Sequence, residues 1–290
     1  MGKGKLLLFL AILIIVEVLG VQVSVENREI LAVDELHVTS SNPDILRINN
    51  GLFVLEVLPN RGRIIWRLHP LCDEREEMIF SSEDPYILPF LDEVTSQYVF
   101  ELGGFYISIP WNPRSNQPYP YEKYEIIEAD NEARIILRGM NPVEKLNTTI
   151  ELVIKDNNPR IFINVIVQNV SESEVVISVK EFTNFHLSDG VITTDFPDLN
   201  GRSLEDFEEY ELITLENDLE FFGVSRGKYV LKKILTNTYS RHYVQIWGKN
   251  WQECIGGSPS VRLTDERFKE TLSPNEQYSF GITFELVSWQ

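Results

Sequence analysis

From about residue 45 to the end of the chain, hydrophobic and polar residues alternate in short runs that are bounded by turn residues. Runs of this kind, rich in Ile, Val, Phe and Thr, are typical of β-strands with one buried face. Residues 51–59 and 62–70 flank a Pro-Asn-Arg-Gly turn and predict a β-hairpin. Further runs predict strands over residues 124–129, 133–140, 147–156, 160–170, 174–185, 210–215, 219–225, 228–236, 242–248 and 277–287.

The number and spacing of these runs predict an all-β fold, a large antiparallel β-sandwich. No motif repeats at a fixed period, which excludes a propeller or a solenoid. Residues 203–211 predict at most a short helix, and no Gly/Ser-rich or Pro-rich linker divides the chain, so we expect one domain over residues 45–290. Residues 81–122 combine many prolines with aromatic residues and carry the weakest strand signal, so we expect a functional loop there.

Residues 1–23 have the composition of a targeting segment. Lys3 and Lys5 precede an apolar run over residues 6–20, as in a secretory signal peptide. The alternative is an uncleaved N-terminal membrane anchor, because residues 6–23 approach the ~20 residues that span a bilayer. Both interpretations place the rest of the chain outside the cytoplasm, secreted or anchored. We expect residues 24–44 to form a linker or an edge strand.

The net charge of −18 narrows the class of partner. Such a field repels phosphate backbones and anionic lipids, so we expect no nucleic-acid partner and contact with a membrane only through the N-terminal segment. Cys72 and Cys254 lack the spacing of a metal or redox site, and either a disulfide or two free thiols is consistent with the sequence. No motif predicts a metal site or a cofactor, and the oligomeric state is left open.

Three segments, taken in order, carry a family resemblance. Residues 49–70 form the opening hairpin, residues 163–190 contain a strand ending at Asn169 with a polar turn and a second strand, and residues 272–287 form a closing turn and last strand. This series resembles the galactose mutarotase (aldose 1-epimerase) superfamily over most of residues 50–290. The resemblance implies a β-supersandwich with a sugar-sized cleft and a carbohydrate or other polyol ligand.

The chain departs from this family in its catalytic residues. The resemblance implies a histidine acid and a glutamate base acting on the anomeric centre. Thr183 and Asn184 match the family's signature strand, and Phe185 fits its later phenylalanine, so the usual histidine is missing. Val261 and Arg262 stand where the glutamate is expected. We therefore expect the fold without the standard epimerase groups.

Three residues are candidates for displaced catalytic groups: His186, Asp189 and Glu253. An imidazole with a pKa of about 6.5 suits proton transfer, and His186 needs a neighbour such as Asp189 to orient it. The alternative is a structural role for His186, as a strand-end histidine that is hydrogen-bonded to the next turn.

Residues 103–124 are a candidate ligand-binding segment. The Gly103–Gly104 pair permits backbone conformations or close approaches that side chains forbid. Aromatic rings offer flat faces to a sugar, and amide and guanidinium groups bind hydroxyls or carboxylates. The alternative is a self-packed proline-rich loop that covers a sheet edge. The candidate binding residues here are Trp111, Asn112, Arg114, Tyr119 and Tyr121.

The strand around residues 240–247 supplies a second binding candidate. Its period of two places Arg241, Tyr243, Gln245 and Trp247 on one face, and His242 with its apolar alternates on the core side. Arg241, Gln245 and Trp247 suit a polyol-binding face, although a tryptophan there is also consistent with a core position.

Three hypotheses for function follow. The first is an exported carbohydrate-binding protein without standard epimerase chemistry. The second is a sugar-active enzyme, an epimerase or lyase variant with displaced catalytic groups. The third is a structural or interaction module of the cell surface. A His–Glu pair converging on one cleft distinguishes the second hypothesis from the other two.

Overall fold

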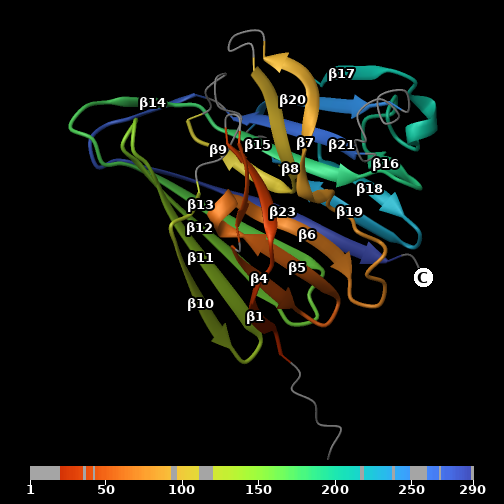
Figure 1. The fold of residues 1–290 in the computed structure, drawn as a ribbon, viewed down its shortest axis with the longest axis horizontal. Coiled ribbons are helices and arrows are strands. Elements are labelled where there is room, and N and C mark those ends of the chain that lie inside the picture. The colour runs from red at the N-terminus through yellow and green to blue at the C-terminus, as the bar shows by residue number, and fades with distance from the viewer. Residues whose placement is uncertain are drawn as a thin grey trace, which may run out of the picture.

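The computed structural model describes residues 20–34, 37–41, 43–92, 97–110, 120–215, 219–236, 239–248, 260–267 and 269–288, with the backbone alone at 30–41 and 82–102. Figure 1 shows two large sheets that pack face to face, and nearly all regular structure in these residues is β-strand. The predicted all-β sandwich is confirmed.

The large sheet has nine antiparallel strands. Its central members come from distant parts of the chain, so the sheet brings residues 63–70, 105–108, 180–186 and 260–267 side by side. In spatial order the strands are β1 (Gln22–Asn27), β4 (Asp44–Asn49), β5 (Phe53–Leu58), β6 (Arg63–Pro70), β9 (Phe105–Ser108), β15 (Lys180–His186), β21 (Ser260–Arg267), β20 (Tyr239–Trp247) and β17 (Tyr210–Leu215).

The small sheet has eight antiparallel strands. Consecutive β10 to β13 form a meander, and the last strand, β23, joins that meander to the remaining three strands. In spatial order the strands are β10 (Lys123–Ala129), β11 (Glu132–Asn141), β12 (Leu146–Lys155), β13 (Arg160–Asn169), β23 (Gln277–Ser288), β19 (Tyr229–Ile234), β18 (Phe221–Arg226) and β16 (Gly190–Thr194).

The hydrophobic core lies between the two sheets. Alternation along β12 buries Leu146, Ile150 and Leu152 toward the large sheet while their neighbours stay partly exposed. Phe105 of β9 meets Phe284 of β23 with ring centroids 5.0 Å apart, which places both sheets in one core. Burial of these apolar side chains is the main stabilising contribution to the fold.

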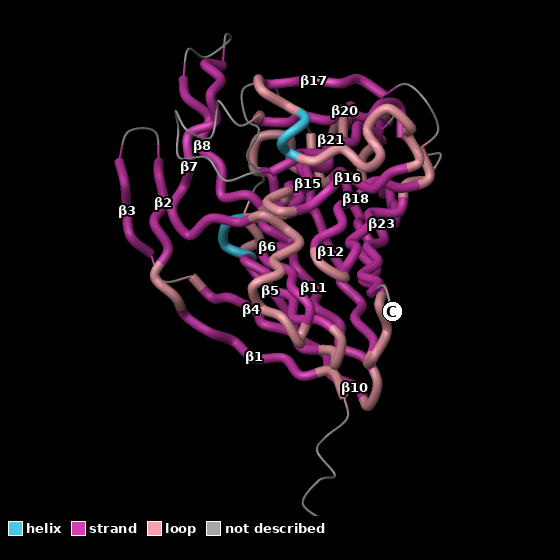
Figure 2. Tube along the Cα trace, turned by 90° about the vertical axis from the view of Figure 1, so that its right-hand side faces the viewer, coloured by secondary structure: helices cyan, strands magenta, loops and turns pink. Residues whose placement is uncertain are grey.

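Two hairpins lie on the side of the large sheet that faces away from the small sheet. They are β2 (Ile30–Asp34) with β3 (His37–Ser41), and β7 (Ser81–Asp92) with β8 (Gln97–Gly103). Figure 2 shows both at the left, with β2 beside β7, and the small sheet at the right. Four short elements complete the inventory of named elements: β14 (Val175–Ile177) paired with β22 (Glu270–Leu272), η1 (Pro59–Arg61) and η2 (Leu204–Asp206).

The prediction of a loop over residues 81–122 is largely wrong, because most of the described residues in this range form strands. β7, β8 and β9 all fall within it, and β9 is a central strand of the large sheet. The prolines concealed the pattern: the register of β7 against β8 shifts between Ser81 and Tyr86 and again between Leu88 and Leu91. Pro85 and Pro89 lie within these shifts, where a residue without an N–H is tolerated.

The predicted hairpin and turns are confirmed. Gly62 ends η1 with φ 66° and turns the chain from β5 into β6. Asn169 ties the central turn to the closing turn, because its side-chain nitrogen donates to the carbonyls of Ser173 and Leu272. The amide N–H of Asn275 donates to the Asn169 carbonyl from the other side. The second and third resembling motifs therefore meet in space.

At the N-terminus, β1 begins at Gln22 and forms the edge of the large sheet beside β4. It starts one residue before the end of the predicted targeting segment, whose residues 1–19 lie outside the described ranges. Over the described part of the chain, the structure contains no helix of the length and hydropathy that crossing a bilayer requires. Cys72 is exposed and forms no disulfide with a described residue, and Cys254 lies outside the described residues.

Candidate functional site

The face of the large sheet turned away from the small sheet is called the outer face, and its part over β9, β15, β21, β20 and β17 is the candidate site. Burial does not show which side chains of β15 face this site, since residues 181–185 are all buried. Their contacts do show it. Phe185 meets Phe222 of the small sheet and therefore points inward. Phe182 stacks on Tyr106, and Asn184 accepts a hydrogen bond from Arg262, so these side chains point outward.

A ladder of rings and guanidinium groups crosses six strands of this face. The guanidinium of Arg63 lies 4.2 Å from the ring centroid of Tyr106, which stacks on Phe182 at 4.8 Å. Arg262 lies between Phe182 and Trp247, 5.8 and 5.4 Å from their rings, and Trp247 meets Tyr210 at 6.0 Å. Cation–π and aromatic pairs of this kind stabilise the side-chain arrangement across neighbouring strands.

Arg262 is anchored at the centre of the ladder by Asn184 and Gly104. Its Nε donates to the Asn184 side-chain oxygen at 2.9 Å, and the Asn184 side-chain nitrogen donates to the Gly104 carbonyl at 2.9 Å. Gly103 and Gly104 have φ of 69° and 81°, and a Cβ on Gly104 would meet the Ile65 carbonyl at 2.7 Å. At this pair the left-handed backbone and the close approach both require glycine.

The accessible part of the outer face lies over β15, β21, β20 and β17. Gln245 donates to the Tyr210 hydroxyl at 3.1 Å, and the Tyr243 hydroxyl donates to Glu266 at 3.3 Å. Lys180 extends over the Tyr243 ring, with its nitrogen 5.4 Å from the centroid. These side chains are half-buried, which leaves polar atoms and ring edges within reach of a ligand.

Alternation along β20 is confirmed. Arg241, Tyr243 and Gln245 are exposed or half-buried, whereas His242 points into the core. Trp247 belongs to the predicted face but is only 6% exposed, because it packs within the ladder against Tyr210 and Arg262. It packs beside the accessible side chains and does not expose its ring.

Two side chains on this face, Lys180 and Tyr210, have shifted pKa values. Burial lowers the pKa of Lys180, with Glu266 opposing that shift and Arg241 adding to it. Burial raises the pKa of the Tyr210 hydroxyl, against the opposing effects of Gln245 and Arg262. Lys180, Glu266 and Arg241 therefore act on one another at the accessible end of the site.

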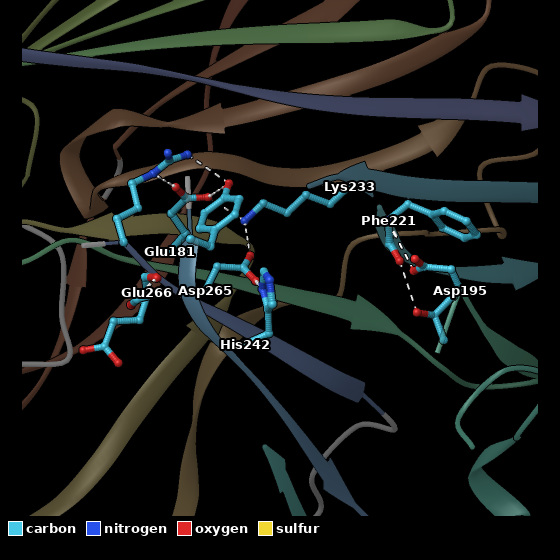
Figure 3. Close-up of polar contacts among 11 residues, drawn as sticks. Glu181, Asp195, Phe221, Lys233, His242, Asp265 and Glu266 are labelled. Atoms are coloured by element: carbon cyan, nitrogen blue, oxygen red, sulfur yellow. Dashed lines mark hydrogen bonds and ion pairs between the residues drawn. The ribbon is translucent and has the colours of Figure 1, made fainter. Parts of the chain in front are cut away.

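Directly behind the site, between the sheets, lies a buried polar network that the sequence analysis did not find (Figure 3). Lys233 of β19 binds Glu181 at 2.6 Å and also binds Asp265, and all three side chains are fully buried. Arg267 donates to Glu181 at 2.6 Å and to the Tyr239 hydroxyl at 2.9 Å. A signal was present: Lys233 shares the alternation of the core residue Leu231.

His242 completes this network. Its Nδ1 lies 2.6 Å from Asp265. Burial opposes ionisation of Asp265, but Lys233 and His242 together hold the pKa of its carboxyl below the ordinary value. The ionised carboxylate therefore accepts the hydrogen bond, and His242 donates through Nδ1. Its imidazole therefore belongs to the buried network and points away from the outer face.

His186 lies at the far end of β15 from Lys180. Its ring stacks on Phe80 at 5.8 Å, and burial, with Arg226, lowers its pKa to about 4. Asp189 lies in the exposed turn that follows, with φ 53°. His186 pairs with Ser260 while Glu266 pairs with Lys180, so six residues, or about 20 Å, separate His186 from Glu266 along the strands.

Tyr121 was predicted to face a ligand, and the structure corrects this. Its side chain is 4% exposed and belongs to the main hydrophobic core, where burial raises the pKa of its hydroxyl. Tyr121 also packs against Gly139, where a Cβ would lie 3.2 Å from its ring. The candidates Trp111, Asn112, Arg114, Tyr119 and Glu253 lie outside the described residues. Among the residues that the structure does describe, no cluster of His, Cys, Asp and Glu is arranged to hold a metal ion.

Comparison with known proteins identifies the architecture. No protein-family model matches the chain, and no curated protein matches it either. Among solved structures, a TPR-domain-containing protein from Parabacteroides distasonis matches with TM-score 0.71 at 14% identity, over 93% of this chain and 56% of that one. The chain thus spans little more than half of that protein.

Two further solved structures match over nearly their whole length. A galactose mutarotase-like protein from Lactobacillus casei has TM-score 0.53 at 11% identity, over 84% of this chain and 100% of that one. A galactose mutarotase-like protein from Clostridium acetobutylicum has TM-score 0.56 at 11% identity, over 91% of this chain and 99% of that one. At these identities the likeness shows the fold, and the fold is the one that the sequence motifs predicted.

Proposed function

Since the chain has the fold of galactose mutarotase-like proteins, we propose that it is an exported carbohydrate-binding protein that lacks the usual acid–base pair of an epimerase. Fold alone does not determine function, so the proposal depends on the outer face.

The observation that carries the proposal is the composition of the accessible site. Tyr243, Gln245 and Tyr210 present ring edges, a hydroxyl and an amide on adjacent strands. Ring faces and edges pack against the C–H surface of a sugar, while amides and hydroxyls bond its hydroxyl groups. Tyr210 is held by Trp247 of the ladder and by Gln245, and a preorganised site loses less conformational entropy on binding.

The arrangement of acid–base groups favours binding over catalysis. Epimerisation at an anomeric centre needs an acid and a base that reach one ring together. At the outward positions of β15 and β21, His186 and Glu266 are about 20 Å apart along the strands. Arg262, held by Asn184, occupies the position where the family resemblance places the base.

Export is part of the same proposal. Lys3, Lys5 and the apolar run over residues 6–20 support a secretory signal or an anchor, and either would present the site outside the cytoplasm.

A glycan array probed with the purified full-length protein tests binding, and an NMR assay of anomer equilibration tests catalysis. We expect binding to at least one glycan with no acceleration of anomer exchange. Gln245→Ala should weaken binding about tenfold, because it removes an amide from the accessible site. Gln168→Ala, on the small sheet, is the matched control and should bind normally.

The other outcomes select the other hypotheses. Accelerated anomer exchange that Gln245→Ala reduces would favour a sugar-active enzyme. Absence of binding to any glycan, together with unchanged anomer exchange, would reject both carbohydrate functions and favour a structural or interaction module.

A further inference from the structure

The charge of the candidate site is opposite to that of the whole protein. The chain has 44 acidic and 26 basic residues, for a net charge of −18. At the outward positions of the described parts of β9, β15, β21, β20 and β17, the basic side chains are Lys180, Arg241 and Arg262, and the acidic one is Glu266. Arg63 adds a guanidinium from β6, over the Tyr106 ring. A local reversal of this kind indicates the sign of the partner's charge.

Two basic side chains at the accessible end of the site, Lys180 and Arg241, flank the same carboxylate. Lys180 and Arg241 both stand opposite Glu266 in the sheet, as its neighbours on β15 and β20. Lys180 is half-buried, and its ammonium lies over the Tyr243 ring, whose hydroxyl donates to Glu266. Tyr243 and Glu266 thus confine the lysine side chain, so that it loses little conformational entropy when a ligand binds.

We propose that the ligand of this face is a saccharide with an anionic group, which Lys180 and Arg241 bind while its neutral part lies along Tyr243, Gln245 and Tyr210. The inference rests on the proposed carbohydrate function and names the substrate class of that site. A uronate carboxylate, a sulfate ester and a phosphate ester share the required chemistry.

An anion at this position relieves two unfavourable interactions. Burial disfavours the charged form of Lys180 in the unliganded protein, and Arg241 adds to this effect while Glu266 opposes it. A negative group beside both cations adds to the compensation that Glu266 provides, and its hydrogen bonds to them are charge-assisted. Neutral hydroxyls provide neither effect, so an acidic sugar should bind more tightly than its neutral counterpart.

Calorimetric titration of the full-length protein tests this, in detergent micelles without sugar headgroups. The main probes are a tetragalacturonate and its carboxyl-reduced counterpart, which differ only in the charged groups. A sulfated and a phosphorylated saccharide distinguish the source of the anion. We expect the tetragalacturonate to bind at least about tenfold more tightly than the reduced form, and the difference to shrink as salt is raised from low to high concentration.

Substitutions of the two basic residues test whether they cause the preference for the acidic saccharide. Lys180→Gln and Arg241→Gln should each reduce the preference for the acidic saccharide by about tenfold. Lys228→Gln is the matched control, since Lys228 is an exposed lysine in the turn between β18 and β19. Far-UV circular dichroism and thermal melting establish that each variant is folded.

Each result decides the inference. Tight binding of a sulfated or phosphorylated saccharide in place of the uronate supports it and assigns the anion. Equal or tighter binding of the neutral saccharide overturns it and leaves the proposed carbohydrate function standing. A preference for acidic saccharides that survives both Lys180→Gln and Arg241→Gln also overturns it. Absence of binding to every probe and every arrayed glycan overturns both proposals.

Discussion

At the scale of single residues, Lys233 is the clearest case of a side chain whose environment gives it its role. An ammonium group in a protein interior costs several kcal/mol of desolvation unless carboxylates compensate it. Glu181 and Asp265 do so from two strands of the large sheet, while Lys233 comes from the small sheet. The network therefore links the sheets at the level of the site.

We expect Lys233→Met to lower the free energy of unfolding by roughly 3–5 kcal/mol, because it leaves two buried carboxylates without their shared cation. Urea denaturation measures this. The neighbouring Lys232→Met is the control: Lys232 is only partly buried and lies over the Phe221 ring, so its loss should cost about 1 kcal/mol or less. Equal losses in the two variants would contradict the buried network.

His186 predicts a pH dependence of stability. Burial and Arg226 lower its pKa to about 4 in the folded protein, below the value of 6.5 in the unfolded chain. Between these values the unfolded chain binds more protons, so stability rises with pH, and this contribution is lost as pH falls from 6.5 toward 4. The full effect amounts to roughly 3 kcal/mol.

Unfolding free energies of the wild type and His186→Gln, measured from pH 4 to pH 7.5, test this. The variant should lose the part of the pH slope that His186 causes. An identical slope in both proteins would show that other groups produce it. Ligand affinity near neutral pH should change little, because His186 lies at the opposite end of β15 from Lys180.

At the scale of elements, the turn between β8 and β9 depends on two glycines. Gly103 and Gly104 both have positive φ, and a Cβ on Gly104 would lie 2.7 Å from the Ile65 carbonyl. The Gly104 carbonyl also accepts two hydrogen bonds, from the main-chain and side-chain nitrogens of Asn184. This turn therefore positions the residue that orients Arg262.

Gly104→Ala should destabilise the protein by roughly 2 kcal/mol or more, because both the backbone conformation and the close approach are lost. Gly281→Ala is the control: Gly281 lies in β23 with open space at its Cβ position, so alanine there should be neutral or slightly stabilising. Thermal melting compares the two. A harmless Gly104→Ala would contradict the role of the turn.

Prediction of elements from sequence succeeded where the strand pattern is local and regular. Residues 242–248 and 277–287 alternate clearly, and β20 and β23 contain nearly all of them. The region of β7 to β9 failed because its prolines disturb the period, and the register shifts that accommodate them arise only on pairing. Periodicity also placed Arg241 and Gln245 on the outer face, but it gave no means of finding Asn184 opposite Arg262.

At the scale of the whole molecule, the large sheet needs its N-terminal edge strand. β1 pairs with β4 along Gln22–Asn27, and Val21 and Val23 pack against the core. An exposed β4 would present unpaired backbone groups to other chains.

Deleting residues 1–28 should therefore lower the free energy of unfolding by roughly 2–3 kcal/mol and promote aggregation, since it removes the contacts of Val21 and Val23 and the pairing of β1. Deleting residues 1–19 leaves β1 in place and serves as the control. Urea denaturation and light scattering measure the two effects. Equal behaviour of the two truncated proteins would show that β1 adds little to the fold.

The sequence by itself determined the fold class, most strands and the two faces of each, because side-chain alternation is a local property that needs no partner. Its motif order also identified the architecture. Only the tertiary structure decided which strands are neighbours, and therefore that Glu181, Lys233 and Asp265 share one buried site and that Arg262 lies between Phe182 and Trp247. These contacts join segments far apart in the chain, and their free energy depends on burial that exists only once both sheets are packed.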